Sequence, residues 1–290
     1  MIETFIQYLS FEKRFSPHTI VAYQKDIEQF YETINGNDSD VKTLTHRDIR
    51  SYLVELVEQD LENTTINRKL SSLKTFFKFL KREGEITINP MVKVQGLKQK
   101  KQLPQFVPEN QLWDKGTFND YEDAFTNLRD ELILELFYQT GIRLSELINL
   151  KINQINEKQI KVIGKRNKER VIPIPKALYL LINEYILERN LINSSSESLI
   201  IDKKGKKLEP KFVYSKVNYY LSKVTNLKKR SPHVLRHTFA THMLNNGASL
   251  ESIKSILGHT DLTATQVYTH NTFKQIKDIY KTAHPRGGGE

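Results

Sequence analysis

The sequence contains no cysteine among its 290 residues. This absence excludes disulfide bonds, cysteine nucleophiles and thiolate metal sites. The chain also has no apolar run of about 18 residues, the length that a membrane-spanning helix needs. Its N-terminus, MIETFIQYLSFEK, carries acidic and polar residues where a secretory signal would be apolar. We therefore expect a cytoplasmic protein without membrane segments.

Acidic residues are scarce toward the C-terminus. The formal net charge of the whole chain is +10, and the excess is unevenly distributed. Residues 1–100 carry 15 Lys or Arg against 14 Asp or Glu, whereas residues 206–290 carry 14 against 5. Such a basic region favours an anionic partner, and nucleic acid explains it better than a solvated basic face does.

The first hundred residues predict a small all-α domain. Ser16 and Pro17 have the residue types of an N-cap and a first helical position, and apolar residues follow at helical spacing. Further helices are predicted over DIRSYLVELVEQ and TTINRKLSSLKTFFKFLKREG. Residues 95–110 lose this periodicity and predict an extended basic linker. The predicted boundaries are 1–94 for the helical domain, 95–110 for the linker and 111–290 for a second domain.

The second domain is predicted to be mainly α with a small β-hairpin. The segment LRDELILELFYQTG predicts an amphipathic helix that ends at Gly141, and IRLSELINL predicts a short helix after it. QIKVIGKRNKERVIPIP alternates apolar and polar residues around a basic turn, as a hairpin does. Five more helical stretches follow: KALYLLINEYILERN, KFVYSKVNYYLSKV, a helix capped by Ser231-Pro232, SLESIKSIL ending at the C-cap Gly258, and a last stretch that carries Tyr268.

Residues 233–242, HVLRHTFATH, place three histidines and one arginine among apolar residues. His233 and His237 are four apart and so could share a metal ion. The zinc-protease arrangement, however, needs a glutamate after the first histidine, where this chain has Val234. His233 and Arg236 are three apart and suit the non-bridging oxygens of a phosphate. The nucleophile and the leaving-group acid must then come from elsewhere.

Four blocks, TGIRLSEL, GKRNKER, HVLRHTFATHML and LGHTDLTATQVYTH, resemble in order the motifs of the tyrosine recombinases, and most closely those of the Xer-type chromosome-dimer resolvases. The resemblance extends over essentially the whole chain. It implies a two-domain, C-shaped clamp around DNA, with a helical core-binding domain followed by the catalytic domain. It also implies a site-specific recombinase that works through a 3′-phosphotyrosine and a Holliday junction, without metal or cofactor.

The resemblance implies a role for each residue of the motifs. Arg143 and Arg236 would clamp the scissile phosphate, and Lys165 would protonate the 5′-hydroxyl leaving group. His233 would assist proton transfer and phosphate binding, and His259 would donate to a phosphate oxygen. Tyr268 would be the nucleophile. The residues expected to contact DNA are Arg68, Lys69, Ser72, Lys74 and Lys78 on the third predicted helix and Arg166, which replaces the family's usual glycine, in the hairpin.

The partners implied by the resemblance are double-stranded DNA with inverted half-sites and further recombinase subunits. These subunits would be copies of this chain in a tetramer, or a second related recombinase, and a cell-division DNA translocase is a further candidate. Chromosome-dimer resolution at cell division is the favoured role. An integrase, excisionase or invertase of a mobile element is the alternative role. A non-catalytic basic DNA-binding protein, a nuclease and a topoisomerase are alternatives of other classes.

Two further interpretations bear on the site and on assembly. Arg143 and Glu146 are three residues apart, so they could simply form an ion pair on a helix surface. The C-terminal segment NTFKQIKDIYKTAHP carries Phe273, Ile276 and Ile279 without an obvious local partner. The resemblance implies that this segment docks on a neighbouring protomer, and the alternative is that it folds back onto its own chain.

Overall fold

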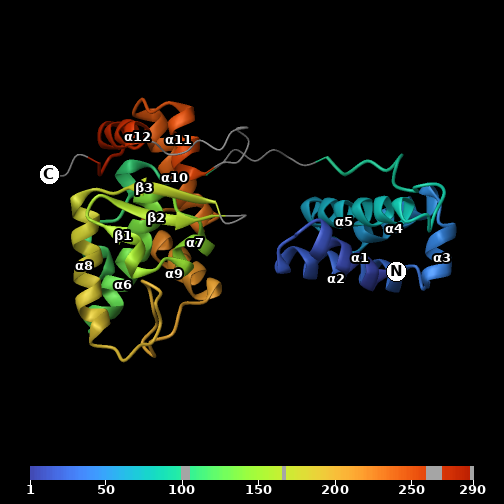
Figure 1. The fold of residues 1–290 in the computed structure, drawn as a ribbon, viewed down its shortest axis with the longest axis horizontal. Coiled ribbons are helices and arrows are strands. Elements are labelled where there is room, and N and C mark those ends of the chain that lie inside the picture. Colours follow the sequence, from blue (N-terminus) through green and yellow to red (C-terminus); the bar gives the residue numbers. More distant parts are fainter. Residues whose placement is uncertain (99–104, 165–167, 259–269, 288–290) are drawn as a thin grey trace. The chain divides into compact units, whose positions relative to one another are not determined.

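The computed structural model describes residues 1–98, 105–164, 168–258 and 270–287 (Figure 1). The chain divides into two compact units, Met1–Gln102 and Leu103–Glu290, each with its own hydrophobic core. The fold is mainly α, and the sheet in the described residues of the second unit is small and antiparallel, as the sequence predicts. Among the described residues, no helix combines the length and apolarity that a membrane crossing requires.

The first unit is built from helices around a core rich in phenylalanine. Ser16 accepts the amide of Thr19 and Pro17 is the first residue of α2, which confirms the predicted start of that helix. Asn37 accepts the amides of Ser39 and Asp40 and so caps a short helix that the sequence reading missed. The elements are α1 (Ile2–Gln7), a π-helical turn (Tyr8–Glu12), α2 (Pro17–Thr33), α3 (Asp38–Thr43), α4 (His46–Glu58) and α5 (Asn63–Arg82).

The described ends of the predicted linker pack onto the two units. The side chain of Asn67 on α5 donates to the carbonyl of Leu97 at 2.9 Å and accepts its amide at 2.8 Å. On the other side, Val107 is fully buried in the core of the second unit, and its amide donates to Thr238 Oγ1 at 3.0 Å. Residues 95–98 and 105–108 lie in no helix or strand, and side chains of their own units satisfy part of their backbone. The linker boundaries 95–110 stay a prediction.

The second unit combines seven α-helices with a three-stranded sheet in its described residues. The strands run in the order β1-β2-β3, and Val162 of β2 faces Arg170 of β3. The hairpin was predicted, whereas the short β1 was not. The elements are 3-10 turns at Glu109–Gln111, Lys115–Phe118 and Ile152–Gln154, α6 (Ala124–Thr140), α7 (Leu144–Asn149), β1 (Ile155–Asn156), β2 (Gln159–Ile163), β3 (Glu169–Pro173), α8 (Lys176–Asn190), α9 (Pro210–Val224), α10 (Pro232–Asn245), α11 (Leu250–Leu257) and α12 (His270–Ala283).

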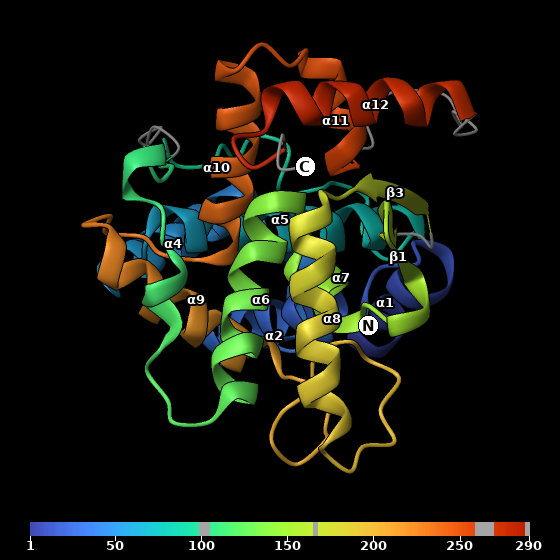
Figure 2. The same ribbon diagram turned by 90° about the vertical axis from the view of Figure 1, so that its left-hand side faces the viewer.

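Helix α6 is the centre of the second unit and packs beside α8, α9 and α10 (Figure 2). The sequence predicts an amphipathic helix, but every residue from 132 to 140 is buried. Each polar side chain between residues 132 and 140 has at least one partner inside the core. Glu135, for example, accepts Trp113 Nε1 at 2.8 Å and Gln139 Nε2 at 2.7 Å. A helix that is enclosed on all sides buries its polar residues too, provided that each finds a partner.

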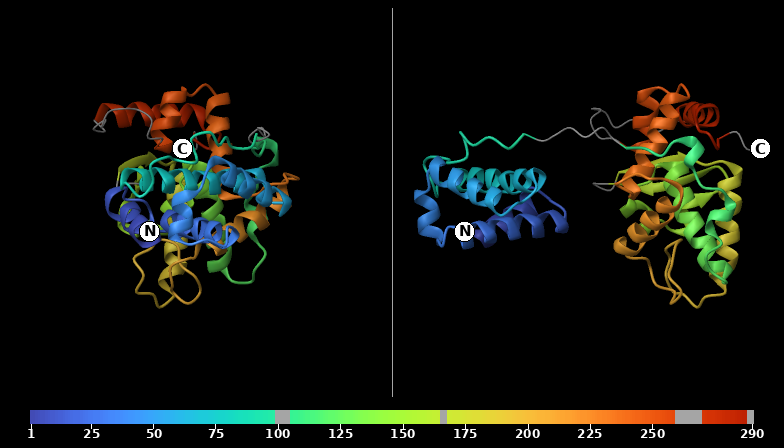
Figure 3. Two further views of the ribbon diagram at one scale, coloured as in Figure 1. Left: turned by 90° about the vertical axis from the view of Figure 1, so that its right-hand side faces the viewer. Right: turned by 180° about the vertical axis from the view of Figure 1, so that it is seen from behind.

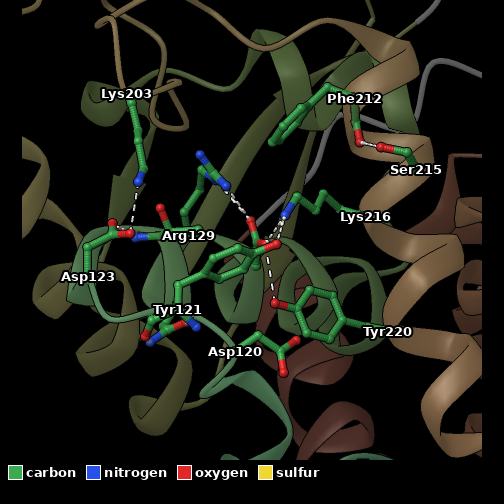
Figure 4. Close-up of polar contacts among 12 residues, drawn as sticks. Asp120, Tyr121, Asp123, Arg129, Lys203, Phe212, Ser215, Lys216 and Tyr220 are labelled. Atoms are coloured by element: carbon green, nitrogen blue, oxygen red, sulfur yellow. Dashed lines mark hydrogen bonds and ion pairs between the residues drawn. The ribbon is translucent and has the colours of Figure 1, made fainter.

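A buried ion cluster joins α6 to α9 (Figure 4). Asp130 is fully buried, and its carboxylate accepts hydrogen bonds from Arg129 and Tyr220. Lys216 Nζ lies 2.8 Å from the same carboxylate and 4.6 Å from the ring centroid of Tyr121. Because an unpaired buried carboxylate is costly, these partners fix the position of α9 against α6.

The C-terminal helix α12 packs against its own chain. It lies beside α11 at one end of the second unit (Figure 3) and also contacts α10 and β3. Ile276, Tyr280 and Ala283 belong to the hydrophobic core, and Tyr280 Oη donates to the carbonyl of Gln139 at 2.9 Å. The expectation that this segment docks on a neighbouring protomer is therefore wrong for residues 275–287, because α6 and α10 supply apolar and polar partners within the chain.

His284 and Arg286 fasten the end of this segment to the core. Arg286 donates to Glu135 and, at 3.0 Å, to the carbonyl of Trp113. The ring of His284 stacks on Tyr280 with 4.9 Å between the centroids. Its Nδ1 accepts the amide of Arg286 at 3.1 Å, which assigns the proton to Nε2. Burial lowers the pKa of His284 to about 3, so the imidazole is neutral in the folded chain.

We expect this buried histidine to make the second unit less stable in mild acid. The unfolded chain takes up a proton at His284 near pH 6.5 and the folded chain does so near pH 3, so stability falls as the pH drops through that window. The contribution is up to about 1.4 kcal/mol of unfolding free energy for each pH unit below about 6.5. The measurement is urea unfolding at pH 7, 6 and 5, followed by the fluorescence of Trp113, the one tryptophan of the chain.

The variant His284→Phe keeps a stacking ring and does not titrate. Its stability should depend less on pH than that of the wild-type chain, although it will be lower at pH 7 because the hydrogen bonds are lost. His18→Phe is the control, because His18 is exposed on α2 in the first unit and does not belong to the core of the second unit that contains Trp113. The Trp113 transition of this variant should have the wild-type pH dependence. Identical slopes for His284→Phe and the wild-type chain would contradict the assignment.

Candidate active site

The end of α6 places the first arginine of the predicted site. Gly141 ends the helix with φ +58°, a left-handed conformation that favours glycine. A Cβ atom on Gly141 would lie 2.6 Å from Leu257 Cδ2 and 2.8 Å from Phe239 Cδ1, so this turn packs directly against α10 and the end of α11. Arg143 follows two residues later as the N-cap residue of α7.

The carboxylate of Glu146 lies at the centre of the site and is nearly buried. It accepts the amide of Arg143 at 2.9 Å and its Nη1 at 2.7 Å, and it accepts Nη1 and Nη2 of Arg170 at 2.7 and 2.8 Å. Burial raises the pKa of Glu146, but the hydrogen bonds and charges of Arg170 and Arg143 outweigh this effect and lower it to about 2. The carboxylate is therefore ionised at any physiological pH.

The Arg143–Glu146 ion pair that the spacing allows is present, but it is not a surface pair. The side chain of Glu146 is 2 % exposed, whereas that of Arg143 is 34 % exposed. Glu146 thus binds Nη1 of Arg143 from the protein interior, while about a third of the Arg143 side chain stays exposed and can reach a ligand. This arrangement suits an arginine that binds an external anion.

Three arginines meet at the C-terminal end of α11. The consecutive carbonyls of residues 256–258 accept, in order, Arg170 Nε at 2.7 Å, Arg236 Nη2 at 2.7 Å and Arg143 Nη2 at 2.9 Å. The last carbonyls of a helix have no partner within it and carry the negative end of the helix dipole. The helix end therefore brings together arginines from three separate segments, and two of them are predicted phosphate ligands.

This cluster has more positive than negative charge. Among the described residues, the guanidiniums of Arg143 and Arg170 bind the single carboxylate of Glu146, and Arg236 donates only to backbone carbonyls, including that of Gly141. Burial, together with the charges of Arg143 and Arg170, lowers the pKa of Arg236 to about 9. The group still carries its charge at neutral pH. A bound anion would relieve this repulsion, so the site is suited to a phosphate.

His233 lies in the first turn of α10, exposed and three residues before Arg236. Residues at this spacing share one side of a helix, so both side chains can reach the same ligand. Ser231 precedes the helix as predicted, but its hydroxyl makes no capping bond: it is buried and has no hydrogen-bond partner among the described residues. His242 is buried in the core, where its Nδ1 lies 3.1 Å from Tyr138 Oη, as a structural residue would be.

Lys165, Arg166, His259 and Tyr268 lie outside the described residues, so the structure gives only the positions of their neighbours. Gly164 donates to the carbonyl of Lys168 at 2.8 Å and closes the hairpin around the predicted tip. A Cβ atom on Gly164 would lie 3.3 Å from Glu146 Oε1, and one on Gly258 would lie 3.0 Å from Arg170 Cδ. The segments that carry Lys165 and His259 therefore start beside the arginine cluster.

Arg170 was not among the predicted site residues, and Glu146 was expected only as a possible surface ion-pair partner of Arg143. A signal for Arg170 is nevertheless present in the alternation of β3. Arg170 and Ile172 are both buried, whereas Glu169 is exposed and Val171 is partly exposed. An arginine on the inward face of a strand requires a buried acceptor. The pattern predicts that such a partner exists, although it does not identify Glu146.

Two of the predicted DNA contacts on α5 are not on its surface. Ser72 is fully buried and donates to the buried carboxylate of Asp26 at 2.7 Å, and the nearly buried Lys69 has its Nζ 3.6 Å from the same carboxylate. The predictions for Lys69 and Ser72 are therefore wrong, because Asp26 of α2 draws both inward. The remaining three candidates, Arg68, Lys74 and Lys78, are exposed, and Arg68 is also ion-paired with Asp26.

We expect Gly141→Ala to destabilise the second unit strongly. The added methyl group would need space that Leu257 and Phe239 already fill, and alanine is strained at positive φ. Together these effects should lower the unfolding free energy by about 2–4 kcal/mol. Gly247→Ala is the matched control, because Gly247 has φ +88° but no atom within 4 Å of the added Cβ. It should lose only about 1–2 kcal/mol. Equal losses in urea unfolding would show that the close packing at Gly141 does not matter.

Comparison with known proteins identifies relatives over nearly the whole chain. Residues 116–275 match the Phage integrase family, and residues 2–84 match the Phage integrase N-terminal SAM-like domain. Tyrosine recombinase XerC of Staphylococcus haemolyticus (strain JCSC1435) is 37 % identical over 291 residues, which cover 99 % of this chain and 97 % of the relative. Tyrosine recombinase XerC of Staphylococcus aureus (strain JH9) is 38 % identical over 292 residues with the same coverage.

A solved structure supports the fold independently. The crystal structure of the XerH site-specific recombinase bound to a palindromic difH substrate, a post-cleavage complex, aligns with a TM-score of 0.71 and 22 % identity. The alignment covers 89 % of this chain and 78 % of that one. At this identity the match establishes a shared fold and nothing more about the site.

Proposed function

The chain belongs to the phage integrase family and is a tyrosine site-specific recombinase of the Xer type, and from this premise we propose that it cuts and rejoins DNA through a 3′-phosphotyrosine at Tyr268 and a Holliday junction. The observation that carries the proposal is the meeting of Arg143 and Arg236 at one helix end. This pair would supply the positive charge that a scissile phosphate needs. An exposed His233 one turn before Arg236 adds a third group to the same place.

Strand cleavage follows as a balanced transfer. The phenolic oxygen of Tyr268 forms a bond to phosphorus, and the bond from phosphorus to the 5′-oxygen breaks. Lys165 gives its proton to the leaving 5′-oxygen, and His233 assists removal of the tyrosine proton. In rejoining, a 5′-hydroxyl attacks the phosphotyrosine and the protons return. No external energy source is needed, because the phosphodiester is exchanged for another ester rather than hydrolysed.

The arginine cluster supports this reaction electrostatically. Phosphoryl transfer increases the charge on the non-bridging oxygens, and fixed cations stabilise that charge without reorganising. Tyrosine has an ordinary pKa near 10, so it becomes a nucleophile at neutral pH only in a strongly positive environment. Arg143 and Arg236 would provide such an environment, and Lys165 would add to it.

The first unit is proposed to add the remaining contacts to duplex DNA. Arg68, Lys74 and Lys78 are exposed on α5 and would contact phosphates, as would Arg166 at the hairpin tip. We propose that the two units close around the duplex as a C-shaped clamp. The palindromic substrate of XerH supports inverted half-sites, because symmetric sites suit symmetric assemblies of recombinases. A tetramer of this chain, or one formed with a second recombinase, would then join two duplexes.

The proposed biological role is the resolution of chromosome dimers at cell division in the cytoplasm, with a DNA translocase as a further partner. The naming of the relatives as XerC supports this role over that of a mobile-element integrase, excisionase or invertase. Recombination by a purified chain on a plasmid carrying two directly repeated sites would test it. Excision should depend on sites from the host chromosome, whereas a mobile-element enzyme would prefer element ends.

We expect the wild-type chain to become covalently attached to DNA that carries a nick near its target. The substrate is genomic DNA of the host that carries a few random nicks. Where a nick lies close to the cleaved bond, cleavage releases a short fragment that carries the 5′-hydroxyl. Once this fragment has diffused away the strand cannot be rejoined, so the adduct persists. Adducts that resist SDS are collected and sequenced, and the sequence they share defines a synthetic nicked duplex. Tyr268→Phe should abolish adduct formation on this duplex while it still binds DNA.

The control is Tyr179→Phe, which removes a phenol from a partly buried position on α8. It should form adducts at the wild-type rate. The absence of adducts with the wild-type chain, or their persistence with Tyr268→Phe, contradicts the mechanism. A topoisomerase would be revealed by adducts without a shared sequence and by relaxation of supercoiled DNA, and a nuclease by strand cleavage without an adduct.

Lys165→Ala tests the assignment of the general acid. We expect this variant to slow cleavage of the ordinary duplex by about 10²–10⁴-fold, the usual contribution of a general acid. A duplex with sulfur in place of the bridging 5′-oxygen releases a thiolate, which needs no proton. On that substrate the variant should react within about 3-fold of the wild-type chain. Equal losses on both substrates would remove Lys165 from this role.

A further inference from the structure

We propose that Arg170 of β3 is a positioning residue of the recombination site, one that holds Arg143 and the end of α11 in register with each other. This inference rests on the proposed function, since it concerns the same site. It assigns a role in the reaction to a residue that is not itself expected to touch DNA. Its basis is the set of hydrogen bonds that Arg170 makes and its burial.

Arg170 is 4 % exposed, so it is enclosed by protein on all sides. This distinguishes it from Arg143, a third of whose side chain is exposed beside the same carboxylate. Arg143 is open to a ligand and Arg170 is not. Any effect of Arg170 on the reaction must therefore pass through the groups that it contacts.

The guanidinium of Arg170 contacts two elements at once. Its two terminal nitrogens bind both oxygens of Glu146, at 2.7 and 2.8 Å, in the paired geometry that only arginine provides. Its Nε donates to the carbonyl of Ile256 at 2.7 Å. A single rigid, planar group thus fixes the start of α7 relative to the end of α11. Arg170 is itself fixed by the β2–β3 hairpin.

Each of these contacts leads to a group with a proposed role. Glu146, held by Arg170, binds the amide and Nη1 of Arg143 and so sets the direction of that side chain. Ile256 lies three residues before His259, and Gly258 approaches Arg170 so closely that a Cβ there would lie 3.0 Å from Arg170 Cδ. The same strand continues to the hairpin tip that carries Lys165. Arg170 therefore connects the start of α7, the β2–β3 hairpin and the end of α11. The proposed function requires the residues carried by these three segments to reach one phosphate.

Loss of this connection should reduce the rate of chemistry rather than the affinity for DNA. Phosphate contacts made by exposed lysines and arginines determine affinity, and Arg170 makes none of them. Positioning errors of about 1 Å reduce rates by up to about 100-fold. Lysine cannot replace the residue, because its ammonium is one point charge and cannot bind a carboxylate in the paired geometry and a separate carbonyl together.

The experiment compares Arg170→Gln and Arg170→Lys with matched variants of Arg189. Arg189 on α8 is equally buried, at 6 % exposure, and donates to three carbonyls, those of Leu199, Ser196 and Ser198. The four variants are assayed on the synthetic nicked duplex defined by adduct trapping. Three quantities are measured for each: the single-turnover rate of adduct formation at saturating protein, the Kd for the duplex, and the thermal midpoint of unfolding.

We expect both Arg170 variants to slow adduct formation by about 10–100-fold with Kd within about 3-fold of the wild-type value. Both Arg189 variants should keep the wild-type rate, even where their thermal midpoints fall as far. Wild-type rates for the Arg170 variants would overturn the proposal, as would equal slowing by the Arg189 variants. If neither Arg170 variant folds while the Arg189 variants do, Arg170 is a structural residue and the proposal is again wrong.

A double-mutant cycle with Arg143→Ala supplies a readout that a structural role would not affect. If Arg170 acts partly through Arg143, the double variant should lose less rate than the product of the two single losses. A multiplicative loss would overturn the connection through Glu146. The failure of the proposed function can be told apart from the failure of this proposal. In the first case the wild-type chain itself forms no adduct, so there is no rate to compare.

Discussion

The candidate active site is organised around one buried carboxylate, that of Glu146. Glu146 begins α7 by accepting the amide of Arg143, and it binds the side chains of Arg143 and Arg170 as well. An ionised carboxylate out of water is stable only when such partners surround it, and removal of one partner leaves an uncompensated charge. Helix α7, the hairpin and the end of α11 must therefore keep one arrangement. The buried contacts of Glu146, and not the conformation of loops, therefore set the geometry of the site.

The same cluster explains why the site needs an anion. The three guanidiniums are balanced by one carboxylate and by the partial charge of a helix end. The lowered pKa of Arg236 reflects burial and the repulsion of its two neighbours. A phosphate bound to Arg143 and Arg236 would remove this repulsion, and it would gain most at the transition state, where its own charge is greatest.

The sequence predicted those features that depend on neighbouring residues. Ser16 and Pro17, Gly141 and Gly258 mark helix ends because the local backbone alone requires them, and the hairpin follows from alternation. Features that depend on distant partners were missed or misread. Ser72 has the sequence context of a surface residue, and only the packing of α2 places Asp26 above it. The apolar face of the C-terminal helix has no partner within its own segment, because its partners lie on β3, α10 and α11 and, through the carbonyl of Gln139, on α6.

Charged residues at core-facing positions therefore predict contacts with distant parts of the chain. Arg170 on the inner face of a strand and Glu135 in the buried stretch of α6 each violate the apolar pattern of their element. A violation is tolerated only if a partner removes the cost of burial, so each one predicts a contact somewhere else in the chain. The pattern does not say where, because the partner is set by packing. In this chain Glu135 secures the C-terminal segment through Arg286, and Arg170 secures the site through Glu146. The exceptions to the pattern mark the long-range contacts on which the arrangement of the site depends.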